Sequence, residues 1–315
     1  MEPATFLVYG MQASWYTGKI RPYLRYKGIR FVEKLPTAFT WYVTIKRRCG
    51  DSTMPVLVTP EGEWLQDTSI IIERLEDRFP EPAVVPREPV QRFVAHLIEL
   101  WADEFWQASG LYTRWKDPAN YPAWADEIGR AFAPGLPGFV QRRVAGVPAR
   151  QMRAYLPTLG ASPEQVPLLE RWTERQLDAL DAHFATLPFL LGTRPAIADF
   201  GLMGPLAGHL YFDVGSRRSY LEPRPHVYAW VRRMNDLTPR QGEFSGDDGI
   251  PGTLTPVLRS IFDEMVPYLA GATDHVRELY SRLAPGERLP RLCGLVEFPL
   301  AADATAGHAC PTRCG

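Results

Sequence analysis

The sequence predicts an α/β domain followed by an all-α domain and a C-terminal helical extension. Strand-like and helix-like runs alternate over about the first eighty residues, and helical periodicity dominates beyond a proline-rich stretch. The 315 residues comfortably hold two domains. We expect the α/β domain over 1–80, a linker over 81–90, the all-α domain over 91–238 and the extension over 239–315. About fifteen residues at the end are small and polar, and we expect them to be disordered.

Composition and charge narrow the class of protein. The apolar content is ordinary for a soluble protein, and the formal net charge of -1 argues against nucleic acid or an anionic membrane as the main partner. No run approaches the roughly 20 apolar residues of a membrane helix. The first residues also lack the basic and apolar regions of a secretory signal. We therefore expect a cytoplasmic protein whose partners include neither nucleic acid nor a membrane.

The four cysteines are too sparse and irregular for a disulfide framework, which favours a reducing compartment. Cys310 and Cys314 lie four residues apart and near His308, a spacing that a metal site could use. No second pair of ligands is evident, so we expect a frayed tail and no bound metal.

The first half of the α/β domain has the pattern of a strand, a helix and a strand. Phe6–Tyr9 is a buried strand, and Lys19–Lys27 is an amphipathic helix with Pro22 in its first turn, where the missing N–H costs little. Gly28 suits the end of that helix. Ile29–Leu35 is a second strand, and the polar and aromatic segment after it has no clear assignment.

The second half has the pattern of a β-hairpin and a helix. Pro55–Val58 is a strand, Pro60–Glu63 is the turn, and Trp64 and Leu65 begin the antiparallel partner. Asp67 caps a helix that runs to about Phe79. The resulting order, β-α-β and then β-β-α, is that of a thioredoxin-like fold.

Beyond the linker the pattern is helical. An aromatic helix covers about Val90 to Trp106, and a segment rich in glycine and proline between Thr238 and Pro256 separates the all-α domain from its extension. The other helices are expected near 149–155, 163–187, 197–212 and 227–235, and in the extension over 254–269 and 272–283.

A proline opens the third strand, at Met54-Pro55. An X–Pro bond is one of the few that tolerates the cis form, at a cost of about 0.5–1 kcal/mol. A cis bond here would turn the backbone N–H and C=O of Met54 away from the sheet edge and toward a ligand. A trans proline at the start of an ordinary strand is the plain alternative.

Asp67 and Thr68 follow twelve residues later, at the start of a helix. The free N–H groups of a helix start suit a carboxylate, and the Asp67 carboxylate suits an ammonium group. Both residue types are also common N-caps. Their position, after Met54-Pro55 and a hairpin, favours a ligand site.

A third motif lies in the all-α domain, where Gly192 to Phe200 contains Ala196 and Asp199. Taken together, the three motifs resemble those of the cytosolic glutathione transferases over about 1–235. In that family the third motif is a buried helix cap with Ser or Thr in the place of Ala196. The loss of such a cap typically costs about 0.5–2 kcal/mol, so this departure concerns stability rather than catalysis.

The resemblance implies a thioredoxin-like domain followed by an all-α domain, with glutathione bound to the first. In the family, the residue before the cis proline pairs its backbone with the cysteinyl backbone of glutathione. The acidic-hydroxyl pair at the helix start holds the γ-glutamyl end. The residues that the resemblance assigns to glutathione here are Met54, Pro55, Gln66, Asp67 and Thr68.

The resemblance also places a hydroxyl group beside the glutathione sulfur, just after the first strand. In the serine-type classes it lies about thirteen residues before the lysine of a Lys-Gly-Ile sequence, here Lys27, which selects Ser14. Thr17 and Tyr9 are the next candidates, and Tyr16 is the fourth. No cysteine occurs in this stretch, which argues against thiol–disulfide chemistry.

The acceptor pocket is expected between the two domains. Trp15, Tyr16, Trp106 and Arg114 are candidates for its lining, and Arg114 suits a carboxylate. A stripe of aromatic residues is nevertheless more often core than pocket.

The function that the resemblance implies is a transferase that activates the glutathione thiol for attack on, or reversible addition to, a small apolar electrophile. One alternative is a non-catalytic binding or scaffold protein, which the long extension and the unusual loop from Ser14 to Gly18 favour. Another is a zeta-like isomerase, because Ser14 sits at the matching position, although the rest of that class's motif is absent. The resemblance also implies a homodimer.

Overall fold

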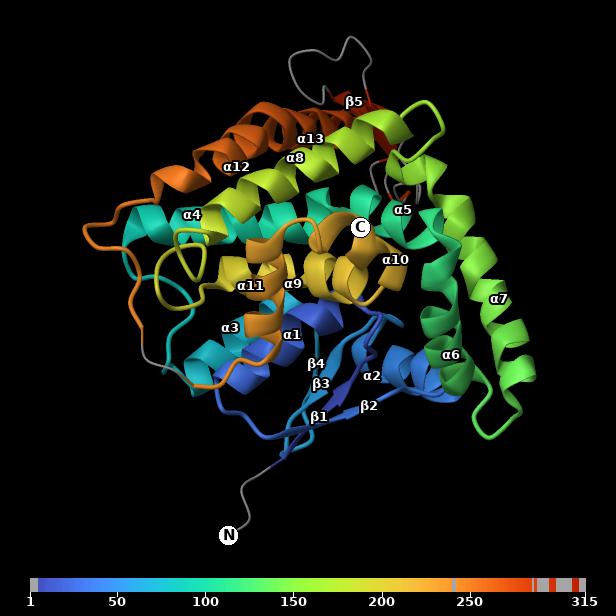
Figure 1. Ribbon diagram of the computed structural model, residues 1–315. Helices are drawn as coiled ribbons and strands as arrows, with labels where there is room; N and C mark the ends of the chain where they lie inside the picture. The colour runs from blue at the N-terminus through green and yellow to red at the C-terminus, as the bar shows by residue number, and fades with distance from the viewer. Residues whose placement is uncertain (1–4, 240–241, 285, 288–294, 299–307, 312–315) are drawn as a thin grey trace.

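A four-stranded mixed sheet lies at the centre of the first domain (Figure 1). Strand β1 (Phe6–Tyr9) pairs in parallel with β2 (Phe31–Lys34) and antiparallel with β3 (Val56–Val58), which pairs with β4 (Trp64–Gln66). The strand order is β2-β1-β3-β4, so the predicted thioredoxin-like arrangement is confirmed. The computed structural model describes residues 5–239, 242–284, 286–287, 295–298 and 308–311.

Helices α1 (Trp15–Tyr26) and α3 (Thr68–Arg78) lie beside the sheet, on the side of the all-α domain (Figure 1). Helix α1 begins four residues earlier than the sequence predicted. Ser14 accounts for the early start, because its extended backbone and its side chain, which accepts from the Thr17 N–H at 3.3 Å, form an N-cap.

The segment that the sequence left unassigned is helical. A π-helical stretch, Thr40–Ile45, leads into α2 (Lys46–Cys49), which ends at Gly50 with a φ of 90°. A left-handed residue at a helix end favours glycine. This helix places the short basic run Lys46-Arg47-Arg48 beside β4.

The all-α domain begins with a nearly continuous helical rod. It consists of α4 (Pro89–Leu100), a π-helical stretch (Trp101–Phe105) and α5 (Gln107–Lys116). The sequence predicted a helix to Trp106 or further, and the rod continues ten residues past that position. The remaining helices are α6 (Tyr121–Phe132), α7 (Gly138–Tyr155), α8 (Val166–Phe184), α9 (Ile197–Pro205) with a π-helical continuation (Leu206–Tyr211), α10 (Val214–Ser216) and α11 (Pro225–Asn235).

Helices α6 and α7 form a hairpin that the sequence analysis did not predict. It identified only the end of α7 and missed α6. Proline and glycine residues around it read as helix breakers. Pro122, however, lies in the first turn of α6, where a proline is tolerated. Gly129 lies where α6 and α7 touch, because an added Cβ would come within 2.7 Å of the Gln141 Cβ.

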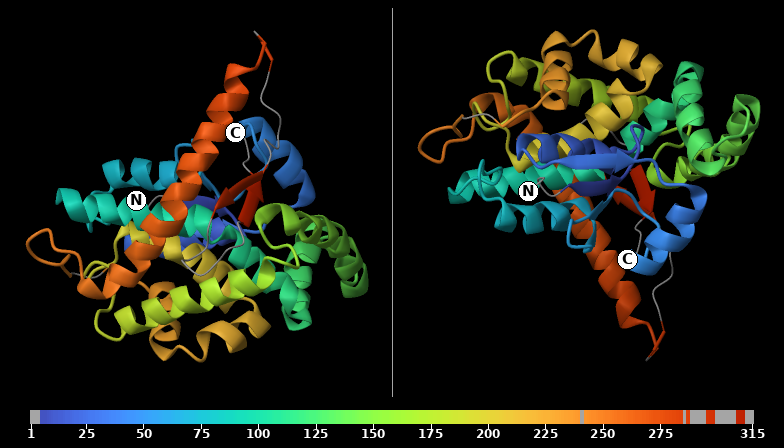
Figure 2. Two further views of the ribbon diagram at one scale, coloured as in Figure 1. Left: turned by 90° about the horizontal axis from the view of Figure 1, so that it is seen from above. Right: turned by 90° about the horizontal axis from the view of Figure 1, so that it is seen from below.

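The extension also differs from the prediction of two separate helices. Thr255 to Ser281 is one uninterrupted helical segment, α12 (Thr255–Ser260), a π-helical stretch (Ile261–Met265) and α13 (Val266–Ser281), which crosses the all-α domain (Figure 2). Strands β5 (Leu295–Phe298) and β6 (His308–Pro311) form a hairpin, so part of the tail that we expected to be disordered is a strand. The rest of that tail lies outside the described residues, and so does Cys314.

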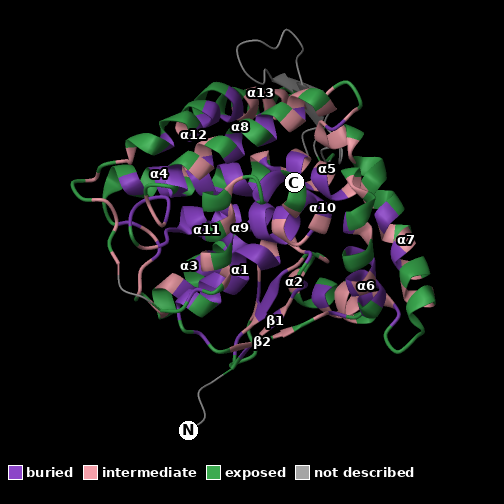
Figure 3. Cartoon of the chain, viewed as in Figure 1, coloured by how far each residue is buried: buried purple, intermediate pink, exposed green. Residues whose placement is uncertain are grey.

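The two domains share a buried interface (Figure 3). The Trp15 ring of α1 enters the all-α domain, where it packs edge-on against His209 at 5.0 Å. Gly110 and Gly204 make room for this ring, because an added Cβ would lie 2.3 Å and 2.5 Å from its atoms. The absence of side chains at these two positions therefore allows α1 to dock.

The Asp199 motif is formed without the missing hydroxyl. The fully buried carboxylate accepts from the backbone N–H groups of Ala196 and Leu190, at 2.9 and 3.1 Å, and from the Trp230 indole at 3.1 Å. The Asp199 half of the reciprocal cap is thus retained, and the Asp199 N–H, which has no hydroxyl acceptor at Ala196, donates to the Ala196 carbonyl at 2.9 Å.

Replacement of Gly110 by alanine should destabilise the protein by about 1–3 kcal/mol, because the new methyl group would overlap the buried Trp15 ring. Gly146→Ala in α7 is the matched control, since its Cβ would meet nothing closer than 3.7 Å. That substitution should stabilise the helix by about 0.5–1 kcal/mol. Urea unfolding of both variants measures the difference, and equal effects would contradict this account of the interface.

Candidate functional site

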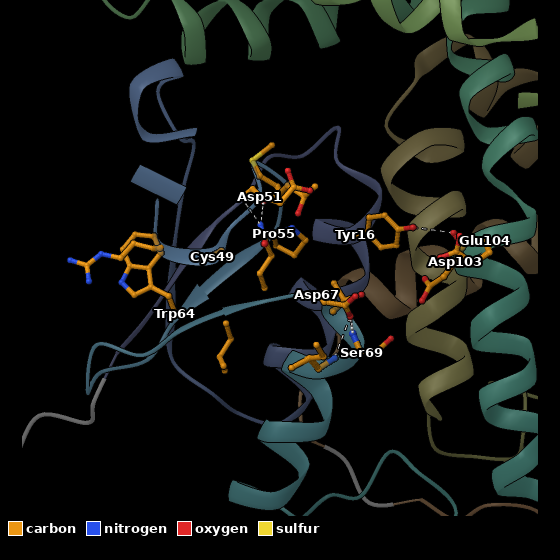
Figure 4. Close-up of a pocket in the computed structure, with 16 residues that line it drawn as sticks. Tyr16, Cys49, Asp51, Pro55, Trp64, Asp67, Ser69, Asp103 and Glu104 are labelled. Carbon is orange, nitrogen blue, oxygen red and sulfur yellow. Dashed lines mark hydrogen bonds between the residues drawn. The ribbon is translucent and has the colours of Figure 1, made fainter. Parts of the chain in front are cut away.

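A cavity of about 670 Å³ opens where both domains meet the turn before β3 (Figure 4). Its walls come from the end of α2, from β4, from the start of α3 and from the rod of the all-α domain. The lining residues used below are Tyr16, Arg48, Cys49, Thr53, Met54, Pro55, Trp64, Gln66, Asp67, Thr68, Ser69, Asp103 and Glu104.

The Met54–Pro55 peptide bond is cis, as the sequence analysis expected. The backbone N–H and C=O of Met54 make no hydrogen bond within the part of the chain that the structure describes. The Gln66 side-chain amide donates to the Thr53 carbonyl at 2.9 Å and to the Asp51 carbonyl at 3.2 Å, and so ties this turn to β4. A fixed turn therefore presents an open donor and acceptor at the cavity.

Asp67 forms the N-cap of α3 in an unusual conformation. Its Oδ1 accepts from the Ser69 N–H at 2.9 Å and from the Ile70 N–H at 3.3 Å, and its φ is 74°. A non-glycine residue with positive φ is uncommon and is found more often at functional sites. The start of α3, with Thr68 and Ser69, thus faces the cavity together with a carboxylate.

One end of the cavity is acidic. Asp67 of the first domain lies across from Asp103 and Glu104 of the rod (Figure 4). Burial raises the pKa of Asp103 to about 7 even though Lys19 opposes the shift, and burial together with Asp67 raises the pKa of Glu104. The site therefore favours a positively charged group that would relieve these carboxylates.

The two carboxylate oxygens of Asp103, a lining residue of the cavity, differ in their hydrogen bonding. Oδ2 pairs with the fully buried Lys19, which also binds Glu99 at 2.7 Å. Oδ1 is buried and has no hydrogen-bond partner in the described structure. A buried carboxylate oxygen without a donor costs free energy, so a ligand donor that reached this atom would relieve that cost.

The other end of the cavity carries a cation. Arg48 of α2 is exposed and lies over the Trp64 ring, 5.8 Å from its centroid. Cys49 beside it is partly buried, and burial raises the pKa of its thiol. A ligand that spans the cavity would therefore meet a positive charge at α2 and negative charges at the rod.

Comparison with models of known protein families shows which family the chain belongs to. The N-terminal domain of glutathione S-transferases matches residues 8–83, and the C-terminal domain of the same family matches residues 152–237. The chain belongs to the glutathione S-transferase family. No curated protein sequence matches it.

Solved structures with similar folds have low sequence identity to this transferase. One from Methylobacterium radiotolerans, crystallised with glutathione sulfonate, is 17% identical with a TM-score of 0.46 and covers 76% of this chain and 98% of its own. One from Rhodospirillum rubrum F11 is 16% identical with a TM-score of 0.47, over 80% and 99%. The β-etherase LigF from Sphingobium sp. strain SYK-6 is 19% identical with a TM-score of 0.46, over 73% and 95%.

Two negative findings apply to the described residues of the transferase. None of their helices is both long and apolar enough to span a bilayer. Their His, Cys, Asp and Glu side chains form no group of three that could hold a metal ion. Cys310 lies in β6, and its side chain is outside this comparison.

Of the four candidate thiol activators, only Tyr16 lines the cavity. Ser14, Thr17 and Tyr9 are not among the lining residues. Thr17 is buried behind Gly10, and the Tyr9 ring stacks on Trp64 at 5.7 Å. Tyr16 does line the cavity. Its hydroxyl donates to the Asp103 carbonyl at 3.2 Å and accepts from Gln107 at 3.2 Å.

Four residues were expected to line the acceptor pocket, and of these only Tyr16 lines the cavity. Trp15 is buried in the domain interface, and Trp106 packs among other tryptophans of the core. Arg114 is buried against Asp213, with 2.8 Å between Nε and Oδ2, so it is not available to a ligand carboxylate. Long-range packing uses these side chains, which the sequence alone could not distinguish from pocket residues.

The loop before α1 is held by the all-α domain. Glu127 of α6 accepts from the backbone N–H groups of Gln12 and Ala13 at 2.7 and 2.9 Å. Arg114 donates to the Ala13 carbonyl at 2.9 Å. Apolar side chains, among them Met11, Met54 and Trp124, pack together beside this loop. The loop that carries Ser14 is therefore fixed on both sides.

Sequence analysis missed Arg48, Cys49 and Glu127. The run Lys46-Arg47-Arg48 beside Gly50 was a local signal of an exposed basic helix end. Glu127 gave no local signal, because its partners lie 114 and 115 residues away.

Removal of the Asp67 side chain should weaken the start of α3. Asp67→Ala should cost about 1 kcal/mol, because two backbone N–H groups lose their acceptor. Asp67→Asn retains an oxygen acceptor and should cost less than about 0.5 kcal/mol. Chemical denaturation distinguishes the two variants, and an alanine variant as stable as the wild type would contradict the capping role.

Proposed function

We propose that the cavity binds glutathione and that the chain is a glutathione-dependent transferase acting on a small apolar electrophile. The observation that carries the proposal is the presence of Met54, with an open backbone N–H and C=O, in one cavity with the capped start of α3. A tripeptide needs both a strand-like pairing partner for its centre and an anion site for a terminal carboxylate.

The charges along the cavity support an orientation of the ligand. The γ-glutamyl carboxylate would accept from the N–H of Thr68, since Asp67 already occupies the N–H groups of Ser69 and Ile70, and the ammonium of the ligand would face Asp67 and Asp103. The cysteinyl backbone would pair with Met54. The glycyl carboxylate would then point toward Arg48 at the other end.

Thiol activation requires a donor near the sulfur. We propose Ser14 for this role, since its hydroxyl accepts from Thr17 and so keeps its own proton for donation. Tyr16 is the second candidate, because it lines the cavity. Burial raises the pKa of the Tyr16 phenol, with Glu104 and Asp103 adding to the effect, so it remains a neutral donor at physiological pH.

One observation favours a second function, that of a non-catalytic binding protein. Glu127 and Arg114 hold the loop of Ser14 in place, and apolar side chains of this chain pack beside it. An acceptor pocket next to the sulfur would need part of that space.

The first test compares binding with turnover. Calorimetric titration should show that about millimolar glutathione binds to the wild type, and conjugation to an aryl halide should fall by about 100-fold in Ser14→Ala. Tyr16→Phe, which removes only the hydroxyl, is the matched variant.

Each outcome has one meaning. No binding at millimolar glutathione would refute the proposed function, and binding without turnover would favour the non-catalytic alternative. A loss of rate in Tyr16→Phe but not in Ser14→Ala would transfer the activating role to Tyr16.

The second test uses pH. Because burial raises the pKa of Asp103 to about 7, its carboxylate is charged above that pH and neutral below it. The affinity for S-methylglutathione, whose sulfur does not titrate, should therefore fall by about tenfold as the pH drops from about 8 to about 6. Asp103→Asn should bind with the weaker affinity and a flatter pH profile. An unchanged profile in that variant would exclude Asp103 from the ammonium site.

A further inference from the structure

The hairpin of α6 and α7 is basic, although the whole chain has a net charge of -1. Residues 128–163, all of which the structure describes, contain no Asp or Glu. The arginines of this segment are Arg130, Arg142, Arg143, Arg150 and Arg153. It lies mainly between the two family matches, which end at residue 83 and resume at residue 152, so the matched parts of the family do not account for it.

The tip of the hairpin is apolar and exposed. Residues 131–140 include no charged side chain and no side chain that donates a hydrogen bond. Within this stretch, Leu136 is 51% exposed and Phe139 is 72% exposed. The connecting loop projects from the body of the molecule at the lower right of Figure 1.

One face of α7 continues this surface. Phe139, Arg143, Val147 and Arg150 follow at helical spacing and are all exposed, whereas Ala145 and Ala149 are buried. Arg142 pairs with Asp126 at 3.1 Å, and Arg153 lies over the Trp115 ring at 4.8 Å. Arg143 and Arg150 have no ion pair within the described residues, so two cations on this face are unneutralised.

We propose that the α6–α7 hairpin docks this protein onto an anionic phospholipid surface, with Leu136 and Phe139 inserted among the head groups and Arg143 and Arg150 facing the lipid phosphates. An apolar tip with a basic helix behind it fits the amphipathic boundary of a bilayer. The convex tip, without hydrogen-bonding side chains, favours lipid over the shaped groove of a protein partner. The near-zero net charge of the whole chain gives no sign of this surface, because acidic residues elsewhere offset the arginines of the hairpin.

The charges and the apolar side chain of the hairpin set the expected strength of membrane binding. Each arginine near an anionic surface strengthens binding by about fivefold. Insertion of the Phe139 ring strengthens it by about tenfold or more. Binding should therefore be reversible and sensitive to salt, since charges at the surface are screened over about 10 Å at 0.1 M.

The experiment is flotation of the full chain with two kinds of vesicle, pure phosphatidylcholine and phosphatidylcholine with about 30 mol % phosphatidylglycerol. We expect binding only to the anionic vesicles, and less of it at about 500 mM salt than at about 50 mM. Phe139→Asp and the double variant Arg143→Glu/Arg150→Glu should each lose at least about tenfold. Tyr280→Asp, on α13, is the matched control because Tyr280 is 69% exposed, and it should bind like the wild type.

Three results would overturn the proposal: no binding to anionic vesicles, equal binding to both vesicles, or full binding by Phe139→Asp. Sedimentation of the same variants tests the alternative that a second copy of the chain covers the hairpin. If Phe139→Asp dissociates an oligomer while the wild type ignores vesicles, the hairpin is an interface between copies of the chain. Thermal unfolding of Phe139→Asp checks that the fold is intact, since the exposed ring makes little contribution to the core.

Discussion

The buried Lys19 is the interaction on which the arrangement of both domains depends. It lies in α1 of the first domain, and its two partners, Glu99 and Asp103, lie on the rod of the second. Burial disfavours the charge on Lys19, but the two carboxylates outweigh that effect and raise its pKa. For Glu99, burial favours the neutral form, while His96 and Lys19 together hold its pKa below the ordinary value. Loss of the lysine would leave Asp103 buried without its cation and Glu99 with His96 alone, at a cost of several kcal/mol.

The same ion cluster shapes the cavity. Asp103 lines the cavity while its Oδ2 pairs with Lys19, so this wall of the cavity belongs to a paired network in which Oδ1 alone has no hydrogen-bond partner among the described residues. Ser69 at the start of α3 adds a hydrogen bond to Glu99 at 3.3 Å, so the helix start that faces the cavity is linked to the rod as well. The acidic end of the cavity is thus a product of domain docking rather than of either domain alone.

Local signals allowed the sequence to predict the sheet and the cap of α3, whereas the cis proline was expected from the resemblance of the combined motifs to the family. Phe6–Tyr9 is an isolated apolar run, and Asp67 precedes a periodic helix, so each is specified by its neighbours in the chain. Arg114 could not be placed in this way, because its ion-pair partner Asp213 lies 99 residues away. Helix α6 was missed for a related reason: Gly129 serves a contact with α7 that becomes visible only when the two helices are packed.

The rod from Pro89 to Lys116 connects parts of the molecule that have been described separately. Asp103 contacts the cavity and Arg114 grips the loop before α1, and the two lie about 16 Å apart along one helical axis. One helical segment therefore carries both the cavity wall at Asp103 and the support of the Ala13 carbonyl at Arg114. Trp101 and Trp106, both fully buried, anchor this segment in the core on either side of Asp103. A substitution that displaces the rod would therefore disturb the cavity wall and the seat of the Ser14 loop together.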